Sequence, residues 1–298
     1  MIIILILLFL TFGFQSSHAA QQTSAPLTPS LTESYQTDLM TGAAVVNVPI
    51  TVPPGRKGIQ PNLALSYSSS NSNGICGVGW QLDLGSIQRN TKRGVPKYDG
   101  SDSFVASING ASIELVDIGN GEYRAKQEGA FMKVSFDGAS WQVKDKSGTT
   151  YSFGSSDNSR QYNSGHIYRW YLDKVTDVNG NYMTVSYLQD QNQVYPQQIQ
   201  YTGKVSADAP VNTVEFIYEA RNDVSSDFRP TFEVRTGKRL SAIDIKADVD
   251  RVRKYILNYS YSADSARSLL MSITQYGSDG ITSLPPITFE YQKGGESQ

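Results

Sequence analysis

Residues 167–189 read IYRWYLDKVTDVNGNYMTVSYLQ, and this stretch decides the fold class. Apolar or aromatic residues alternate with polar ones on both sides of Asn179-Gly180. A period of two places successive side chains on opposite faces of a strand. An Asn-Gly pair between two such runs is the strongest short-range signal for a hairpin. The stretch therefore predicts two antiparallel strands joined by a tight turn.

The same pattern extends in both directions. Upstream, turn pairs separate short alternating runs, and a type I′ turn between such runs requires positive φ at both central residues. Downstream, alternating runs continue as far as ITFEYQK at 287–293. The only helix candidate covers 263–270, about two turns. We therefore predict an all-β, hairpin-rich antiparallel meander; its upstream turn pairs are Asn109-Gly110, Asn120-Gly121, Asp137-Gly138 and Ser147-Gly148.

The two ends of the chain differ in character from this region. Ile2 to Leu10 is apolar, shorter than the roughly 20 residues that span a bilayer, and small residues follow at Ser17 and Ala19. This order is typical of a secretory signal peptide and predicts a secreted protein. No basic residue follows Met1, so an uncleaved anchor or a misplaced start codon stays open as an alternative. The expected organisation is a signal peptide at 1–20, a Ser/Thr/Pro-rich flexible leader at 21–34, a β domain at 35–293 and a polar tail at 294–298.

Composition excludes several functions. The chain has 26 basic and 28 acidic residues, evenly spread, whereas nucleic-acid binding requires a clustered basic face. Cys76 is the single cysteine, so no internal disulfide is expected. After removal of residues 1–20, His166 is the only histidine, and no Gly-x-Ser-x-Gly motif accompanies it. One Cys and one His cannot form a zinc site. We expect no catalytic, cofactor-binding or metal-binding residues, and no integral membrane span.

Three motifs resemble functional sites but have simpler structural interpretations. Asp177-Val-Asn-Gly-Asn181 resembles a calcium loop, yet Leu188 stands where the loop requires its final Glu, and a hairpin turn explains the motif. GICGVG at 74–79 is followed by an alternating run rather than the helix of a dinucleotide loop, which favours a sharp chain reversal. Three tryptophans could form a sugar-stacking platform, although core packing is the commoner use of aromatic residues in alternating runs; they are Trp80, Trp141 and Trp170.

The stretch ITVPPGRKGIQPNLALSYSS, residues 50–69, predicts a stiff corner between two strands. Pro53 and Pro54 end the first strand because proline has no amide N–H to donate. Gly55 and Gly58 permit a tight reversal. Arg56 and Lys57, which could suggest a phosphate site, are expected at a solvated tip.

This corner also carries a family resemblance. Residues 42–89 contain Pro-Pro-Gly-Arg-x-Gly-x-x-Pro-x-Leu-x-Leu-x-Tyr and then Gly-x-Gly-Trp, and they resemble the start of the SpvB-type N-terminal domain. That domain is shared by a Salmonella virulence plasmid protein and the B components of insecticidal Tc toxin complexes. The likeness covers most of residues 35–293, and LDKVTDVNGNYMTVSY at 172–187 also resembles Tyr-Asp repeats of RHS proteins.

The resemblance implies a non-enzymatic structural module of a secreted toxin, virulence or RHS-type protein. It implies a contribution to a larger RHS-like β shell that houses or delivers an effector. Implied partners are toxin-complex or RHS-repeat components, or a C-terminal continuation of the same polypeptide, with self-association through strand edges. Transferase chemistry is not implied, because no two glutamates stand two positions apart as a Glu-x-Glu pair requires. The alternative is a stand-alone secreted β-sandwich adhesin or carbohydrate-binding module.

Overall fold

The computed structural model describes residues 35–37, 44–127, 129 and 131–292. The expected signal peptide, the leader and the polar tail at 294–298 lie outside these residues. Strands dominate the described part, and its one helical element is the short 3-10 helix η1 (Asp157–Ser159). The prediction of an all-β fold is confirmed.

A small sheet forms the N-terminal arm of the molecule. Its strand order is β1-β2-β3-β6, and all its pairings are antiparallel. A separate hairpin, β4 with β5, lies in the chain between β3 and β6. The bounds are β1 (Tyr35–Thr37), β2 (Ala44–Ile50), β3 (Leu63–Ser68), β4 (Asn73–Gly74), β5 (Gly77–Val78) and β6 (Trp80–Leu82).

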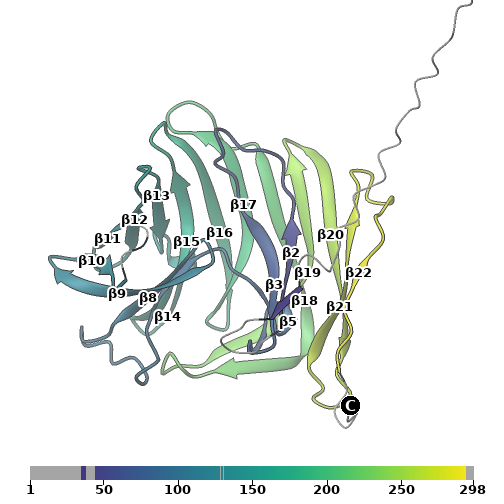
Figure 1. Cartoon of the computed structure of the whole chain (residues 1–298), viewed down its shortest axis with the longest axis horizontal. Coiled ribbons are helices and arrows are strands. Elements are labelled where there is room, and N and C mark those ends of the chain that lie inside the picture. Colours follow the sequence, from purple (N-terminus) through teal and green to yellow (C-terminus); the bar gives the residue numbers. More distant parts are fainter. Residues whose placement is uncertain (1–34, 38–43, 128, 130, 293–298) are drawn as a thin grey trace, which may run out of the picture.

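The next strands close on themselves. Neighbours pair in the order β13-β12-β11-β10-β9-β8-β7-β15, and β13 also pairs with β15, so the path returns to its start. We call this set, β7–β13 with β15, the closed ring; it lies on the left in Figure 1. The bounds are β7 (Ser86–Arg89), β8 (Phe104–Ile108), β9 (Ala111–Gly119), β10 (Glu122–Ala125), β11 (Lys133–Phe136), β12 (Trp141–Lys144), β13 (Thr150–Phe153), β14 (Arg160–Asn163) and β15 (His166–Thr176).

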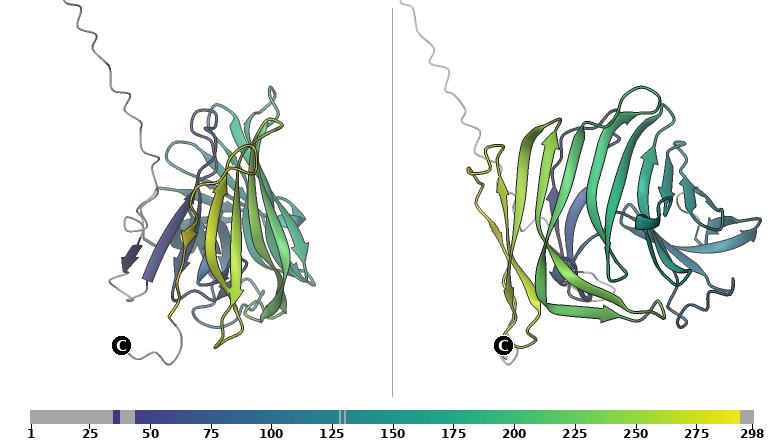
Figure 2. Two further views of the ribbon diagram at one scale, coloured as in Figure 1. Left: turned by 90° about the vertical axis from the view of Figure 1, so that its right-hand side faces the viewer. Right: turned by 180° about the vertical axis from the view of Figure 1, so that it is seen from behind.

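From β15 the sheet continues as a broad antiparallel meander, the open sheet, which ends at β22. Figure 2 shows these long strands side by side from behind. The N-terminal arm covers the other face, where β2 and β3 cross in front of the sheet in Figure 1. The bounds are β16 (Asn181–Asp190), β17 (Gln193–Lys204), β18 (Asn212–Asp227), β19 (Val234–Ala247), β20 (Asp250–Tyr261), β21 (Ser268–Tyr276) and β22 (Ile287–Thr288).

Two hydrophobic cores follow from this division. One lies inside the closed ring and is rich in aromatic side chains, with Trp141, Phe153 and Trp170 almost fully buried. The other lies between the arm and the open sheet, where Leu65 of β3 faces residues such as Ile243 of β19. Strict alternation supplies both cores, as in β12, whose residues are alternately buried and exposed.

The expected turns are present, but they are of two kinds. Asn109-Gly110 and Asn120-Gly121 have positive φ at both residues, as a type I′ turn requires. At Asp137-Gly138, Ser147-Gly148 and Asn179-Gly180 only the glycine has positive φ, so these three turns are not of type I′. At Asn179-Gly180 the reason is Asp177, whose carboxylate accepts the backbone N–H groups of Asn179 and Asn181 and builds a wider turn.

The helix candidate at 263–270 does not form a helix. The chain forms a turn after β20 and then enters β21 at Ser268. The Ser262 hydroxyl accepts the backbone N–H groups of Asp264 and Ser265, and Ala266 has a φ of 54°. A serine that bonds its neighbours' backbone in this way favours a turn over a helix, and pairing with β20 fixes the residues that follow.

Candidate functional site

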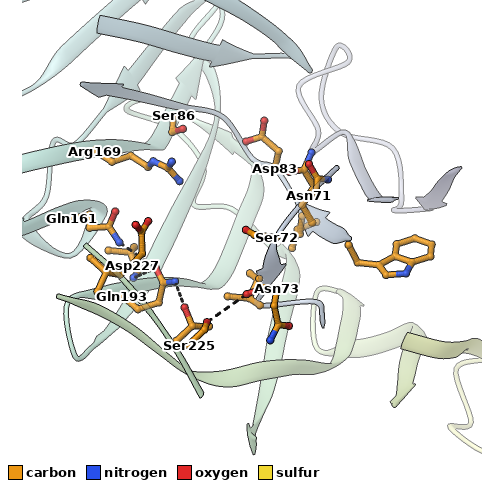
Figure 3. Close-up of a pocket in the computed structure, with 18 of the residues that line it drawn as sticks. Asn71, Ser72, Asn73, Asp83, Ser86, Gln161, Arg169, Gln193, Ser225 and Asp227 are labelled. Carbon is orange, nitrogen blue, oxygen red and sulfur yellow. Dashed lines mark hydrogen bonds between the residues drawn. The ribbon is translucent and has the colours of Figure 1, made fainter. Parts of the chain in front are cut away.

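A hollow lies where the arm, the closed ring and the open sheet meet. It is a cavity of about 1250 Å³. Figure 3 shows polar side chains from all three parts pointing into it. Asn71 lies in the arm after β3, and Asp83 directly follows β6. Arg169 comes from the closed ring and Gln193 from the open sheet. No single sequence motif supplies these residues.

Arg169 is the most distinctive group of the ring wall. Its Nη2 donates to Oε1 of Gln88 on the paired strand β7. Its guanidinium carbon lies 5.7 Å from the ring centroid of Tyr171. Its Nε is buried without a hydrogen-bond partner, and the hydroxyl of the neighbouring Tyr168 is in the same state. Among the described residues, no carboxylate forms an ion pair with Arg169. Asp227 nevertheless lies close enough to interact with its charge: burial raises the pKa of Asp227, but hydrogen bonds from Arg229 and the charges of Arg229 and Arg169 lower it.

Two carboxylates also line the cavity. Asp83 accepts hydrogen bonds from the Gly85 N–H at 2.9 Å and from the Ser107 hydroxyl. Oδ2 of Asp227 accepts hydrogen bonds from Nε of Arg229 at 3.0 Å and from Nη2 of Arg229 at 2.8 Å. Figure 3 shows Arg169 and Asp83 pointing into the cavity from facing sides. The cavity is therefore lined by charges of both signs and not by one sign alone.

Two glutamine side chains and one threonine side chain in the cavity lining are linked by hydrogen bonds. Gln161, itself buried, donates to Oε1 of Gln193 at 3.2 Å. Gln193 in turn donates to the Thr236 hydroxyl at 2.8 Å. These side chains join β14, β17 and β19, which are separate in sequence. Such linked bonds hold each amide in one orientation.

A buried ion pair beside the cavity locks the arm onto the open sheet. The side chain of Arg221 has no exposed surface and that of Asp223 is 6% exposed, and the two are joined by hydrogen bonds of 2.6 Å and 3.0 Å. Arg221 also donates to the Gly74 carbonyl at 2.6 Å. Burial alone would raise the pKa of Asp223, but hydrogen bonds from Arg221, Ser268 and Asn73 outweigh it and hold that pKa below its usual value. The charged groups of Arg221 and Asp223 therefore both serve to hold the fold together.

The glycine-rich stretch at 74–79 is one of the elements that this pair fixes. It forms the β4–β5 reversal, and Gly77 and Gly79 both have positive φ. A Cβ on Gly79 would lie 2.3 Å from the Tyr67 ring, so close packing also requires glycine there. Cys76 at the turn is completely buried, and burial raises the pKa of its thiol to about 12. The interpretation as a chain reversal is confirmed.

The other motifs are also built into the fold. His166 stacks on Tyr98 at 4.3 Å between ring centroids. Asp177 caps its own turn, and among the described residues no group of three or more His, Cys, Asp or Glu side chains is placed to hold a metal ion. The three tryptophans are at most 2% exposed, so they form no surface platform; Trp80 and Trp170 donate their indole N–H to Tyr291 and to the Ala139 carbonyl.

The corner at 50–69 is a tight turn as expected, with one difference. Arg56 and Ile59 form a bridge, and Lys57 and Gly58 between them have φ values of 50° and 84°. Both cations are exposed, but Arg56 is not merely solvated, because its guanidinium lies 2.6 Å from the Asp208 carboxylate. That partner lies in the loop after β17, which sequence reasoning could not place beside the corner.

Taken together, these features define a class of protein: an all-β module with one closed ring, one open sheet and a polar cavity at their junction. The family model described as Salmonella virulence plasmid 65kDa B protein matches residues 39–134 and 121–208, more than half of the 298-residue chain. The chain belongs to this SpvB family. In the part that the structure describes, no helix is long and apolar enough to cross a membrane.

Curated relatives share one part of their length with this chain. The proteins named mono(ADP-ribosyl)transferase SpvB from Salmonella enteritidis and Salmonella typhimurium are each 25% identical over 206 residues. These matches cover 59% of this chain and 34% of each relative. The chain therefore spans about a third of the length of the relatives it matches.

Solved structures share the fold. The N-terminal domain of effector protein SpvB from Salmonella typhimurium strain LT2 matches with a TM-score of 0.67 and 20% identity, over 77% of this chain and 98% of that domain. TcdB2-TccC3 matches with a TM-score of 0.74 and 20% identity, over 87% of this chain and 17% of the other. The fold of this chain thus occurs both as an N-terminal domain and as a small part of a much longer chain.

Proposed function

We propose that this chain is a non-enzymatic structural module of a secreted toxin or RHS-type protein, a wall segment of a larger β shell that houses or delivers an effector. In this proposal residues 35–293 act as one domain. Its partners are toxin-complex or RHS-repeat components, supplied by other chains or by a continuation of this polypeptide.

The observation that carries this proposal is the open sheet. Its last strand, β22, pairs with β21 only through Ser272↔Thr288 and Ile273↔Ile287, and no described strand covers its other edge. Unpaired N–H and C=O groups on such an edge recruit further strands. The match to a minor part of TcdB2-TccC3 supports the idea that a longer wall continues from this sheet.

The non-enzymatic part of the proposal rests on how the reactive groups are used. Among the described residues, Cys76 is buried with a raised pKa, His166 is stacked on a tyrosine, and the Arg221–Asp223 pair is saturated with hydrogen bonds. A nucleophile needs an adjacent base or a lowered pKa. The activity named for the curated relatives would then reside in parts of those proteins that this chain does not match.

Hydrogen exchange and light scattering of the purified full chain test the proposal. A wall segment should show fast amide exchange along β22 and concentration-dependent self-association. It should also transfer no ADP-ribose from NAD to protein acceptors above background. A strictly monomeric chain with a protected β22 would favour the stand-alone adhesin or carbohydrate-binding module, and ADP-ribosyl transfer would refute the non-enzymatic part.

A further inference from the structure

We propose that the cavity between the arm, the closed ring and the open sheet binds a saccharide that carries a carboxylate. The proposal is independent of the shell function, because it concerns the cavity and not the sheet edges. Its starting point is the set of unsatisfied donors on the ring wall.

Arg169 supplies the carboxylate-binding part of the site. Its Nε and the hydroxyl of Tyr168 are adjacent in sequence, buried and without hydrogen-bond partners. Tyr168 is 1% exposed, and both residues line the cavity. Buried donors are nearly always paired, so neighbouring unpaired donors require an explanation. A planar carboxylate is the natural acceptor for a guanidinium that forms no direct ion pair with a protein carboxylate.

The facing wall argues against a bare anion such as phosphate. Asp83 points into the cavity opposite Arg169 (Figure 3) and would repel a ligand that carries only negative charge. Its carboxylate has about four acceptor positions, of which Gly85 and Ser107 use two. Hydroxyl groups of a ligand can donate to the others. The ligand therefore needs one acidic group together with several hydroxyl donors.

The size and the remaining lining of the cavity fit the same ligand class. A volume of about 1250 Å³ exceeds what a single small anion fills, since pockets for drug-sized ligands measure roughly 300–1,000 Å³. Hydroxyl and amide side chains such as Ser86 and Gln161 alternate with the half-buried ring of Tyr171. Sugars present hydroxyls at their edges and C–H groups on their faces, and this lining provides partners for both.

Calorimetric titration of the purified full chain tests the proposal. The acidic probes are sialyllactose and trigalacturonic acid, the neutral probes are lactose and maltotriose, and acetate is the bare carboxylate. At least one acidic saccharide should bind saturably and about tenfold or more tightly than its neutral counterpart, as expected for charge-assisted hydrogen bonds. The stronger of the two acidic probes identifies the sugar type.

Two variants tie the binding to the cavity. Arg169→Met should weaken the acidic saccharide about tenfold or more, whereas Arg124→Met, an exposed arginine on β10 that does not line the cavity, should leave binding unchanged. If Arg169→Met does not fold, Ser112→Trp at the exposed side of the cavity should block binding instead. Absence of saturable binding, equal binding by Arg169→Met or Ser112→Trp, or acetate binding as tight as the sugars would overturn the proposal.

Discussion

The closed ring and the open sheet are made of the same kind of strands but solve the problem of sheet edges differently. In the closed ring every strand has a partner on both sides, because β13 and β7 both pair with β15. Its interior holds clustered aromatic side chains, including the stacked pair Phe136 and Trp141 at 4.4 Å. The open sheet needs the N-terminal arm to cover one face and ends at the short strand β22.

This difference teaches where each region obtains its stability. The ring is stabilised by its own core, so it depends little on the rest of the chain. The open sheet depends on a second layer, and hydrogen bonds fix that layer in place, for example from Arg221 to the Gly74 carbonyl and from the Leu240 N–H to the Ile75 carbonyl. A disturbance of the ring core and a disturbance of the Arg221–Asp223 pair should therefore have different consequences.

The largest effect is expected at the centre of the ring. Trp141 is fully buried among Phe104, Phe136 and Trp170. Trp141→Ala should lower the free energy of unfolding by about 3–5 kcal/mol, measured by denaturant titration. The control Phe131→Ala, at a side chain that is 72% exposed, should change it by less than about 0.5 kcal/mol. A small effect of Trp141→Ala would mean that the ring does not rely on its own core.

The next effect concerns the lock between the arm and the open sheet. Asp223→Ala leaves the positive charge of Arg221 buried without a carboxylate partner. This should lower the free energy of unfolding by about 3 kcal/mol. Hydrogen exchange should show lost protection in β4, β5 and the adjoining part of β18 while the ring strands stay protected. Asp250→Ala, at the exposed first residue of β20, is the control. Equal loss of protection in the ring would remove the distinction between the two regions.

The same pair predicts a pH dependence. The folded-state pKa of Asp223 is lowered from the ordinary value of 3.8, so its contribution to stability is present above that value and is lost as pH falls through the folded-state pKa. The stability difference between the wild type and Asp223→Asn should therefore be largest near neutral pH and shrink in acid. A difference that stays constant down to the acid transition would contradict this assignment.

A smaller effect is expected at the corner that carries the arm across the open sheet. Gly58 has a φ of 84°, and no atom lies within 4 Å of a Cβ built there, so backbone strain alone should act. Gly58→Val should cost about 1–2 kcal/mol. Gly237→Val, at a strand glycine without positive φ, is the matched control and should cost less. Thermal unfolding of the wild type and both variants measures the two losses of stability.

The smallest effect is expected from the ion pair at the same corner. Arg56 and Asp208 have side chains that are 43% and 51% exposed, so solvent screens their attraction. Arg56→Ser should change stability by about 0.5 kcal/mol or less at low salt, and the difference should vanish at about 1 M salt. An effect that exceeds about 1 kcal/mol and persists in salt would show that this ion pair fastens the arm.

Much of the fold could be predicted from the sequence because its signals are local. The alternation around Trp141 and the Asn120-Gly121 turn each follow from a few adjacent residues. The helix candidate at 263–270 forms a turn and a strand instead, because strand pairing and a serine-capped turn outweigh local helix propensity. Closure of the ring could not be predicted, since it depends on β15 pairing with both β7 and β13.

The cavity could not be predicted for a related reason. Arg169 and Gln161 both appear as ordinary polar positions in alternating runs, and Asp83 follows a short strand far upstream. Only the meeting of the arm, ring and open sheet places them together. The only indication in the sequence is the position of Arg169 between two aromatic residues of a strand. An arginine in such a position needs a polar partner, and the sequence does not indicate which residue that is.

Closure through β15 has a consequence for the order of events during synthesis. Gln88 of β7 and its partner Arg169 of β15 are 81 positions apart. At about 5–20 residues per second, roughly 4 to 16 seconds pass between the making of one strand and the arrival of the other. Through that interval the growing chain carries β7 as an unpaired edge, open to contact with neighbouring chains. The region that ends with every edge paired is thus open to aggregation while it is being made.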